Sequence, residues 1–232
     1  MNKNPLFSKA TLDFLVKAGK QKNPTWLEKN DDEYQEVLRR PFVALAERIK
    51  VELEDAAPGY HFPTKGLGRI KRPDFKVVGG KSQFKDWVSL SAQRPPESRF
   101  EANPHLFLGI FPNEDDMGPV VLAAGLWQPS SQQMKKIRRA LAADSSAFHA
   151  LFADKQFKAS FPTGFHMSDV ATRVPRGFEA DHPDVAWLKL KKFVVLKKFS
   201  VKEFSAKNFA EVVVRDYRQG LRLNRLLDEA IN

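Results

Sequence analysis

The chain has 232 residues, a length that fits one domain with a full hydrophobic core. It contains no cysteine, which excludes disulfides, iron–sulfur clusters, thiolate zinc sites and cysteine nucleophiles. Its formal net charge of +10 favours a partner that carries phosphate or carboxylate groups.

The apolar residues near the N-terminus are spaced as one face of a helix. Asp13 and Lys17 lie among them, so the segment does not resemble a signal peptide. No stretch approaches the roughly 20 apolar residues that a membrane span needs. We therefore expect a cytoplasmic protein with no membrane partner.

The residue pattern over positions 1–58 predicts a helical subregion. Ser8 is placed to cap a short helix that ends near Gly19. A second helical pattern follows, with Pro41 either kinking that helix or opening another one. Its apolar residues recur at positions 34, 38, 42, 45, 49 and 53.

Residues 60–128 predict a sheet-rich core. Short apolar runs bounded by Pro, Gly and Asn are typical of antiparallel strands and their turns. The runs are "YHFP", "LGRIKR", "KDWVSLS", "HLFLGIFP" and "VVLAAGLW".

Residues 129–232 predict a helix-rich region with additional strands. The patterns indicate helices at 130–144 and 145–154, strands at 157–161 and 193–200, and a long helix from about Ser205. Helices at both ends and in the middle, around a mostly antiparallel sheet, define the α+β class. We expect a single domain over residues 1–232.

The basic residues are concentrated in two segments. Residues 65–99 hold nine basic and three acidic side chains, and residues 189–232 hold eleven and five. If the two segments meet in the fold, they create one positive face. The alternative is that the lysines only keep two surfaces soluble.

Several stretches, in order, resemble one family. They are "NPTWLEKNDDEYQEVLRRPF", "HLFLGIFP…AAGLWQPSSQQMKKIRRAL" and, most closely, "PRGFEADHPDVAWLKLKKF". The last is similar to a Pro-Arg-Gly-Phe…His-Pro…Leu-Lys signature. Together they resemble the domain of unknown function 2461 family of bacterial and fungal proteins, over nearly the whole chain. The resemblance implies no established activity.

One family element is altered here. Where the family reads about Arg-x-x-Arg-Asp-x-Arg-Phe-Ser-x-Asp-Lys-Thr-Pro-Tyr-Lys, this chain has "RIKRPDFKVVGGKSQFKDW". One inserted residue allows a match to Arg69, Arg72, Lys81 and Lys85. The family's second arginine, its Ser-x-Asp and its Pro-Tyr have no counterpart.

These four basic residues bracket a glycine turn. In a hairpin, residues 69–72 and 81–85 would lie on adjacent strands, so Arg69, Arg72, Lys81 and Lys85 could converge on one carboxylate or phosphate. The alternative is an ordinary charged outer face of a hairpin.

A second candidate site is the segment that contains Arg176 and His182. Gly177 permits a sharp turn, Asp181 can cap the next helix, and an anion could bind between Arg176 and that helix. A capped helix with a packing arginine accounts for the same residues. If both elements serve one ligand, Arg176 or His182 should lie near the 69–85 hairpin.

The last helix carries an arginine stripe at residues Arg215, Arg218, Arg222 and Arg225. Such a stripe is either a solvated face or a contact for nucleic acid or an acidic protein. The tryptophans and phenylalanines are interpreted mainly as core residues.

We find no complete catalytic signature. The five histidines show no metal-ligand spacing, and no nucleophile or dinucleotide motif is present, so we expect no metal and no cofactor. Whether the protein is an enzyme stays open. The leading hypothesis is a small phosphate- or carboxylate-bearing ligand in a basic pocket. The alternative is a non-enzymatic nucleic-acid-associated protein or an adaptor for an acidic protein.

Overall fold

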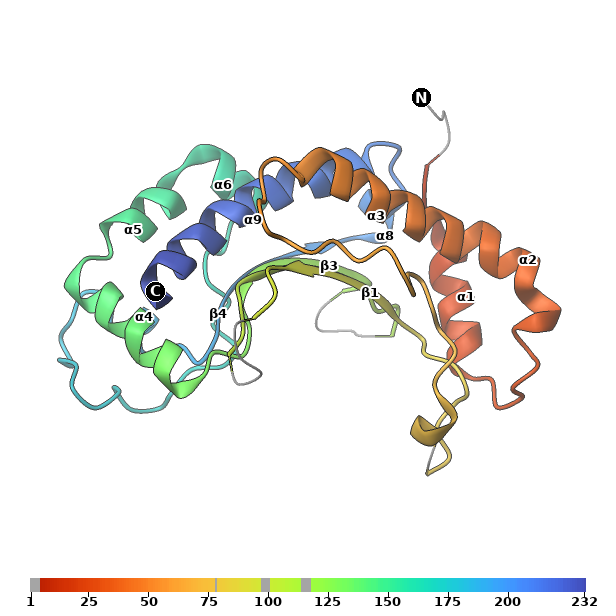
Figure 1. The fold of residues 1–232 in the computed structure, drawn as a ribbon, viewed down its shortest axis with the longest axis horizontal. Coiled ribbons are helices and arrows are strands. Elements are labelled where there is room, and N and C mark those ends of the chain that lie inside the picture. Colours follow the sequence, from red (N-terminus) through yellow and green to blue (C-terminus); the bar gives the residue numbers. More distant parts are fainter. Residues whose placement is uncertain (1–4, 78, 97–100, 114–117) are drawn as a thin grey trace.

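A curved four-stranded sheet forms the centre of the protein (Figure 1). The computed structural model describes residues 5–77, 79–96, 101–113 and 118–232. In these residues the strands follow one another in the order β1-β2-β3-β4, and all pairs are antiparallel. The strands are β1 (Val88–Gln93), β2 (His105–Ile110), β3 (Val120–Leu126) and β4 (Phe193–Phe199). The predicted α+β class with an antiparallel sheet is confirmed.

The two faces of the sheet have different roles. Residues paired across antiparallel strands point to the same side, so the register assigns every strand position to one face. One face packs into the main core through Leu90, Leu106, Leu122 and Val195. We call the other the concave face, because the sheet bends toward it (Figure 1). Its residues are Ser89, Ser91, Gln93, His105, Phe107, Gly109, Val121, Ala123, Gly125, Val194, Leu196 and Lys198.

The long C-terminal helix α9 (Phe209–Ile231) covers the convex face. It approaches β3 at Gly220, where an added Cβ atom would lie 2.6 Å from the Cβ of Ala124. A glycine in the helix interior therefore permits the close contact between α9 and the sheet.

A buried ion pair fastens α9 to the same face. Asp216 is fully buried, and its carboxylate accepts hydrogen bonds from Lys197 of β4 at 2.7 Å and from Ser160 at 2.7 Å. Arg215 donates to the same carboxylate. Because a buried charge is costly without partners, these contacts fix the orientation of α9 over β4.

The N-terminal helices build one end of the molecule. They are α1 (Lys9–Gly19), η1 (Glu28–Asn30), α2 (Asp31–Tyr34), the π-helical segment η2 (Gln35–Arg39) and α3 (Arg40–Leu53). Ser8 caps α1 as predicted. Pro41 lies in the first turn of α3, directly after the π-helical segment, so the residues from 31 to 53 form one continuous but irregular helical run.

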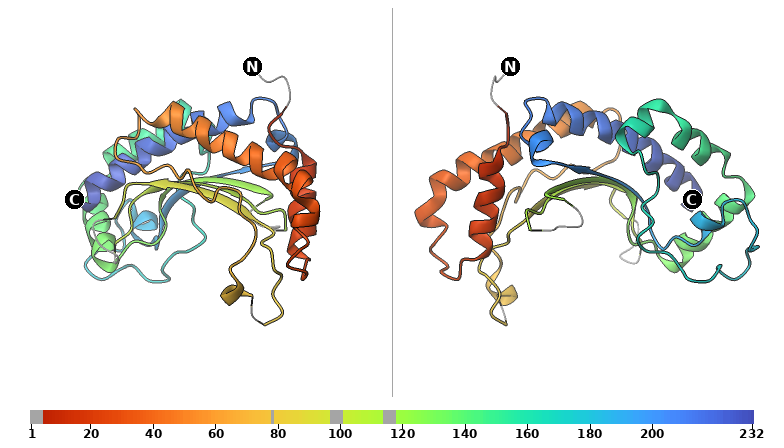
Figure 2. Two further views of the ribbon diagram at one scale, coloured as in Figure 1. Left: turned by 45° about the vertical axis from the view of Figure 1, so that its right-hand side comes forward. Right: turned by 180° about the vertical axis from the view of Figure 1, so that it is seen from behind.

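The middle helices build the other end. They are α4 (Ser131–Ala143), α5 (Ser146–Ala153), α6 (Lys155–Ser160) and the short α7 (Val185–Leu188), and α8 (Val201–Phe204) links β4 to α9. Figure 2 shows the resulting arch from two further sides. The hairpin around η3 (Asp74–Lys76) projects below the sheet at the N-terminal end. The loop before α7 lies at the opposite end.

Several expected elements differ in the structure. Residues 157–161 were predicted as a strand, but residues 155–160 form α6, because Asp154 caps a turn that buries Phe157 and Phe161 on one side. The runs at 60–63 and 67–72 contribute single bridges, His61 with Gln93 and Lys71 with Phe84, rather than strands. Asp181 does not cap a helix, since α7 begins only after Asp184.

The contact between Gly220 and Ala124 can be tested by a double-mutant cycle. In an Ala124→Gly background, Gly220→Ala should raise the melting temperature, because alanine is the better helix former by about 1 kcal/mol. In the wild-type background the same substitution should lower it, because the two methyl groups collide. We expect the two backgrounds to differ by about 1–3 kcal/mol in free energy of unfolding. Equal effects in both would contradict the close approach.

Candidate functional site

The 69–85 hairpin brings Arg69 and Arg72 near Lys85. The backbone N–H of Arg72 donates to Gln83 at 3.0 Å, and that of Lys85 donates to Ile70 at 2.9 Å. Arg69 and Lys81 are exposed, and Arg72 and Lys85 are half-buried. We call these four residues the basic hairpin cluster. They are the ones that the sequence predicted for this site.

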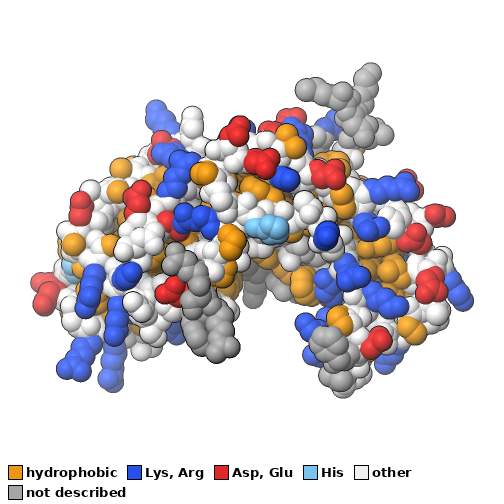
Figure 3. All heavy atoms as spheres, in the orientation of Figure 1, with side chains coloured by type: hydrophobic (Ala, Val, Ile, Leu, Met, Phe, Trp, Pro, Cys, Tyr) orange, Lys and Arg blue, Asp and Glu red, His pale blue; other side chains and the backbone are white. Residues whose placement is uncertain are grey.

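The cluster concentrates positive charge. Burial lowers the pKa of Lys85, and the nearby cations Arg72, Arg69 and Lys76 lower it further. In the described part of the chain, Arg69, Arg72 and Lys81 form no ion pair with a carboxylate, and the Arg72 Nε atom is buried with no hydrogen-bond partner. Lysine and arginine atoms gather at this end of the molecule in Figure 3. An anion bound here would relieve the mutual repulsion.

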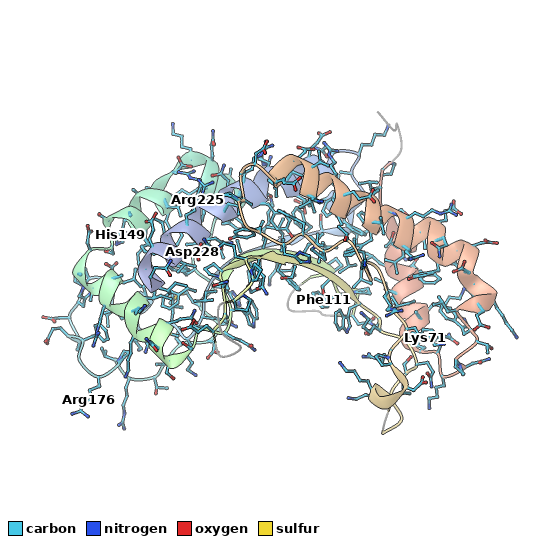
Figure 4. All side chains as sticks on the ribbon, in the orientation of Figure 1. Lys71, Phe111, His149, Arg176, Arg225 and Asp228 are labelled. Carbon is cyan, nitrogen blue, oxygen red and sulfur yellow. The ribbon has the colours of Figure 1, made fainter. Side chains whose placement is uncertain are left out.

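A row of aromatic rings leads from the cluster onto the concave face. The Lys85 Nζ atom lies 4.5 Å from the ring centre of Trp87, which is 6.0 Å from Phe111. Phe111 stacks in turn with Phe107, with ring centres 6.3 Å apart. Figure 4 shows Phe111 beneath the sheet. All three rings are partly exposed.

Gly109 makes room for this row. A Cβ atom there would lie 2.0 Å from a ring carbon of Phe111 and 2.9 Å from one of Phe107. The two rings therefore fold over the glycine backbone. Beside them a small apolar cluster of Val121, Ala123 and Leu196 packs against Phe107, which anchors that ring to the sheet.

At the other end of the concave face an aromatic ring again lies beside a cation. Trp127 follows β3 with 37% of its surface exposed, and the Lys192 Nζ atom lies 4.4 Å from its ring centre. The segment with His166 runs along the edge of β4. Burial lowers the pKa of His166, and the nearby Lys192 and Lys198 lower it further, so this end is also positive.

A cavity of about 430 Å³ opens beside Trp127. Among the described residues its lining combines two aromatic rings with carboxamides and the ring of His105, whose pKa is lowered by burial. The lining residues are Gln93, Ala102, His105, Phe107, Trp127 and Gln128. Its size lies in the range of small-molecule sites.

Arg176 and His182 lie far from the hairpin. Figure 4 places Arg176 at the opposite end of the arch from Lys71, a hairpin residue. Arg176 is exposed. The ring of His182 accepts a hydrogen bond from the backbone N–H of Asp184 at 3.0 Å and belongs to the same end. The two predicted elements therefore do not share one pocket.

The segment near His182 has a structural network around Asp184. This buried carboxylate binds His149 at 2.7 Å and accepts from the hydroxyl of Ser145. Figure 4 shows His149 on α5. Because the carboxylate sits between serine and histidine, the order of a Ser-His-Asp triad is not met. The network joins the start of α5 to α7.

The arginine stripe of α9 is bound within the protein. Arg215 pairs with Asp216, and Arg222 pairs with Asp154 at 2.8 Å. Arg218 and Arg225 donate to the carbonyls of Glu52 and Ala56, and Figure 4 shows Arg225 on α9 beside the α3 end. The stripe therefore attaches α9 to its neighbours.

The concave-face rings were missed by the sequence analysis. Trp87, Phe107, Phe111 and Trp127 were interpreted as core residues, but each is partly or largely accessible. The sequence feature that could have revealed them is the strand alternation in "HLFLGIF", which places residues 105, 107, 109 and 111 on one face. Since Leu106, Leu108 and Ile110 on the other face are also apolar, the pattern does not indicate which face is covered.

The described residues contain neither a metal-binding cluster nor a helix that could span a membrane. No group of three or more His, Asp or Glu side chains there is arranged to hold a metal ion. No helix in that part of the chain combines the length and apolar character needed to cross a membrane.

The fold and the sequence place the chain in a family. It is an α+β protein with a four-stranded antiparallel sheet in its described residues, and a family model described as "Conserved hypothetical protein (DUF2461)" matches residues 10–225. The chain belongs to this family. No curated protein and no solved structure is significantly similar to it.

The positive potential at the Trp127 end can be measured through His166. Lys192→Gln should raise the pKa of His166, because it removes a neighbouring positive charge, while the effect of burial stays. Lys191→Gln is the matched control, since Lys191 pairs with Asp169 at 3.0 Å. A histidine titration followed by NMR compares the three proteins. A pKa that does not rise in Lys192→Gln would show that Lys192 does not act on this ring.

Proposed function

We propose that the protein binds single-stranded nucleic acid along the concave face. The observation that carries the proposal is the set of accessible rings, Trp87, Phe107, Phe111 and Trp127, flanked at its two ends by Lys85 and Lys192. Aromatic rings on a sheet surface stack with unpaired bases, and adjacent cations bind the phosphates.

An unpaired strand fits better than a duplex. Stacking needs the flat face of a base, and in a duplex each base face is covered by its neighbours. The rings of Trp87, Phe111 and Phe107 follow one another in a row, with centres 6.0 and 6.3 Å apart, which suits consecutive bases that have been separated from one another.

The basic hairpin cluster supplies phosphate contacts at one end. Its exposed Arg69 and its half-buried Arg72, which have no carboxylate partner among the described residues, can each bind a phosphate oxygen, and Lys85 lies between them and Trp87. The cluster lies on a projecting hairpin (Figure 1), and its Arg69 and Lys81 are exposed. A chain of phosphates reaches both this cluster and the distant Trp127 end, whereas one small anion does not.

This proposal revises the sequence-based hypotheses. In place of a small anionic ligand, we propose one phosphate group of the bound strand. The basic hairpin cluster binds this phosphate, and no pocket is shared with Arg176 and His182. The nucleic-acid alternative moves from the arginine stripe, whose guanidinium groups have partners in the protein, to the concave face.

Binding by the rings is tested with fluorescence anisotropy. Labelled DNA and RNA single strands should bind more tightly than a duplex of equal length. Phe107→Leu and Phe111→Leu keep an apolar side chain but remove the ring. Each should weaken binding by about 1–3 kcal/mol, or roughly 5- to 150-fold. Melting curves check that the variants fold. Absence of single-strand binding even at about 50 mM salt would eliminate the proposal.

The phosphate contacts are tested by salt dependence. A plot of log affinity against log salt concentration has a slope of about −0.7 for each neutralised phosphate of a single strand. Arg69→Gln and Arg72→Gln should each make the slope less steep by about this amount.

Arg218→Gln is the matched control for these variants, because Arg218 lies on the α9 stripe and contacts Glu52. It should leave the slope unchanged. If Arg218→Gln reduces the slope and the hairpin variants do not, the strand lies on α9. Stabilisation of the protein by inorganic phosphate, with no oligonucleotide binding, would instead support the small-anion hypothesis.

A further inference from the structure

We infer that the cavity beside Trp127 holds one unpaired base of the bound strand and selects adenine. This inference rests on the proposed function and gives it a point of base recognition. The rings of Trp87, Phe111 and Phe107 offer stacking surfaces that suit any base. The cavity differs from them because polar side chains line it together with two rings.

The sheet register places the polar groups together. Gln93 of β1 lies opposite His105 of β2, and His105 lies opposite Gly125 of β3. These positions form one row across the concave face, and Gly125 contributes no side chain to it. Trp127 lies two residues further along the chain. The row therefore leaves a space edged by hydrogen-bonding groups and walled by the rings of Phe107 and Trp127.

The polar lining is suited to an uncharged ligand. The Nδ1 atom of His105 lies 3.4 Å from the carbonyl oxygen of Asn103, which can only accept a hydrogen bond. Nδ1 therefore carries the proton, and in the neutral ring Nε2 is left as an acceptor. Burial lowers the pKa of His105, so the ring is neutral at physiological pH.

The carboxamides favour adenine among the bases. Gln93 and Gln128 each present a donor next to an acceptor, and adenine is the one base with an acceptor nitrogen, N1 or N7, on each side of its amino group, so that two carboxamides can bind its two edges at once. The Lys192 ammonium, 4.4 Å from the ring centre of Trp127, provides a cation for the phosphate next to the base. Adenine of a strand and adenine of a free nucleotide share this chemistry.

The first experiment measures base preference. Labelled oligomers of adenine, cytosine and uracil nucleotides are titrated into the wild-type protein and into Trp127→Ala and Gln128→Ala. The wild type should prefer the adenine oligomer. Trp127→Ala should weaken adenine binding by about 5- to 150-fold and remove the preference, since one stacking contact is lost. Gln128→Ala should reduce the preference and leave cytosine and uracil binding nearly unchanged.

Gln132→Ala is the matched control for Gln128→Ala. Gln132 is an exposed glutamine on α4 and lines a different cavity with Arg94 and Asp228. It should keep the wild-type preference. If oligomers bind but show no preference, or if the preference survives in Trp127→Ala, the inference is overturned while the proposed function stands.

A second experiment separates a strand from a free nucleotide. Adenosine monophosphate is titrated against the wild type and Trp127→Phe, with tryptophan fluorescence as the readout. We expect quenching in the wild type that is lost in Trp127→Phe, and tighter binding of the adenine oligomer. Binding of the mononucleotide without binding of any oligomer would overturn the proposed function and assign the cavity to a free nucleotide. No response to either ligand would overturn both.

Discussion

The close packing of α9 on the convex face of the sheet is the contact on which the rest of the structure depends. Gly220 brings the helix against Ala124, and the buried Asp216 binds Lys197 of β4. An added methyl group at the first contact or a lost charge at the second would disturb the packing of the whole helix. Because α9 and the main core lie on this side, the opposite face of the sheet is left without a covering helix in the described residues (Figures 1 and 2).

That division explains the character of the concave face. Its apolar residues form only a small cluster around Val121, and the rings of Phe107 and Phe111 cover the gap over Gly109. Rings in such positions stay partly exposed, since no described helix packs on their outer side as α9 packs on the convex face. Lys85 and Lys192 lie against Trp87 and Trp127 at the two ends of the face. Cations beside accessible rings are the combination that binds bases and phosphates together.

The two basic segments of the sequence are used differently. In residues 189–232, Lys197 and the arginines of α9 pair with carboxylates and carbonyls, so much of that charge holds helices in place. In residues 65–99 the basic hairpin cluster keeps its charge available. Its arginines have no carboxylate partner among the described residues, and the pKa of Lys85 is lowered first by burial and then by these neighbouring cations. Net charge alone does not distinguish these two uses.

The sequence by itself determined the elements that depend on neighbouring residues. Ser8 capped its helix, the strands at 88–93, 105–110, 120–126 and 193–199 followed their apolar runs, and the 69–85 hairpin placed Arg69 and Arg72 near Lys85, because each of these features follows from a local pattern of residues. Only the tertiary structure decided which face of the sheet α9 covers, and hence that Phe107 and Phe111 are accessible. Both faces of β2 are apolar, so its pattern fits either orientation. The tertiary structure also separated Arg176 from the hairpin and gave the arginine stripe its partners, since those distances depend on how distant elements pack.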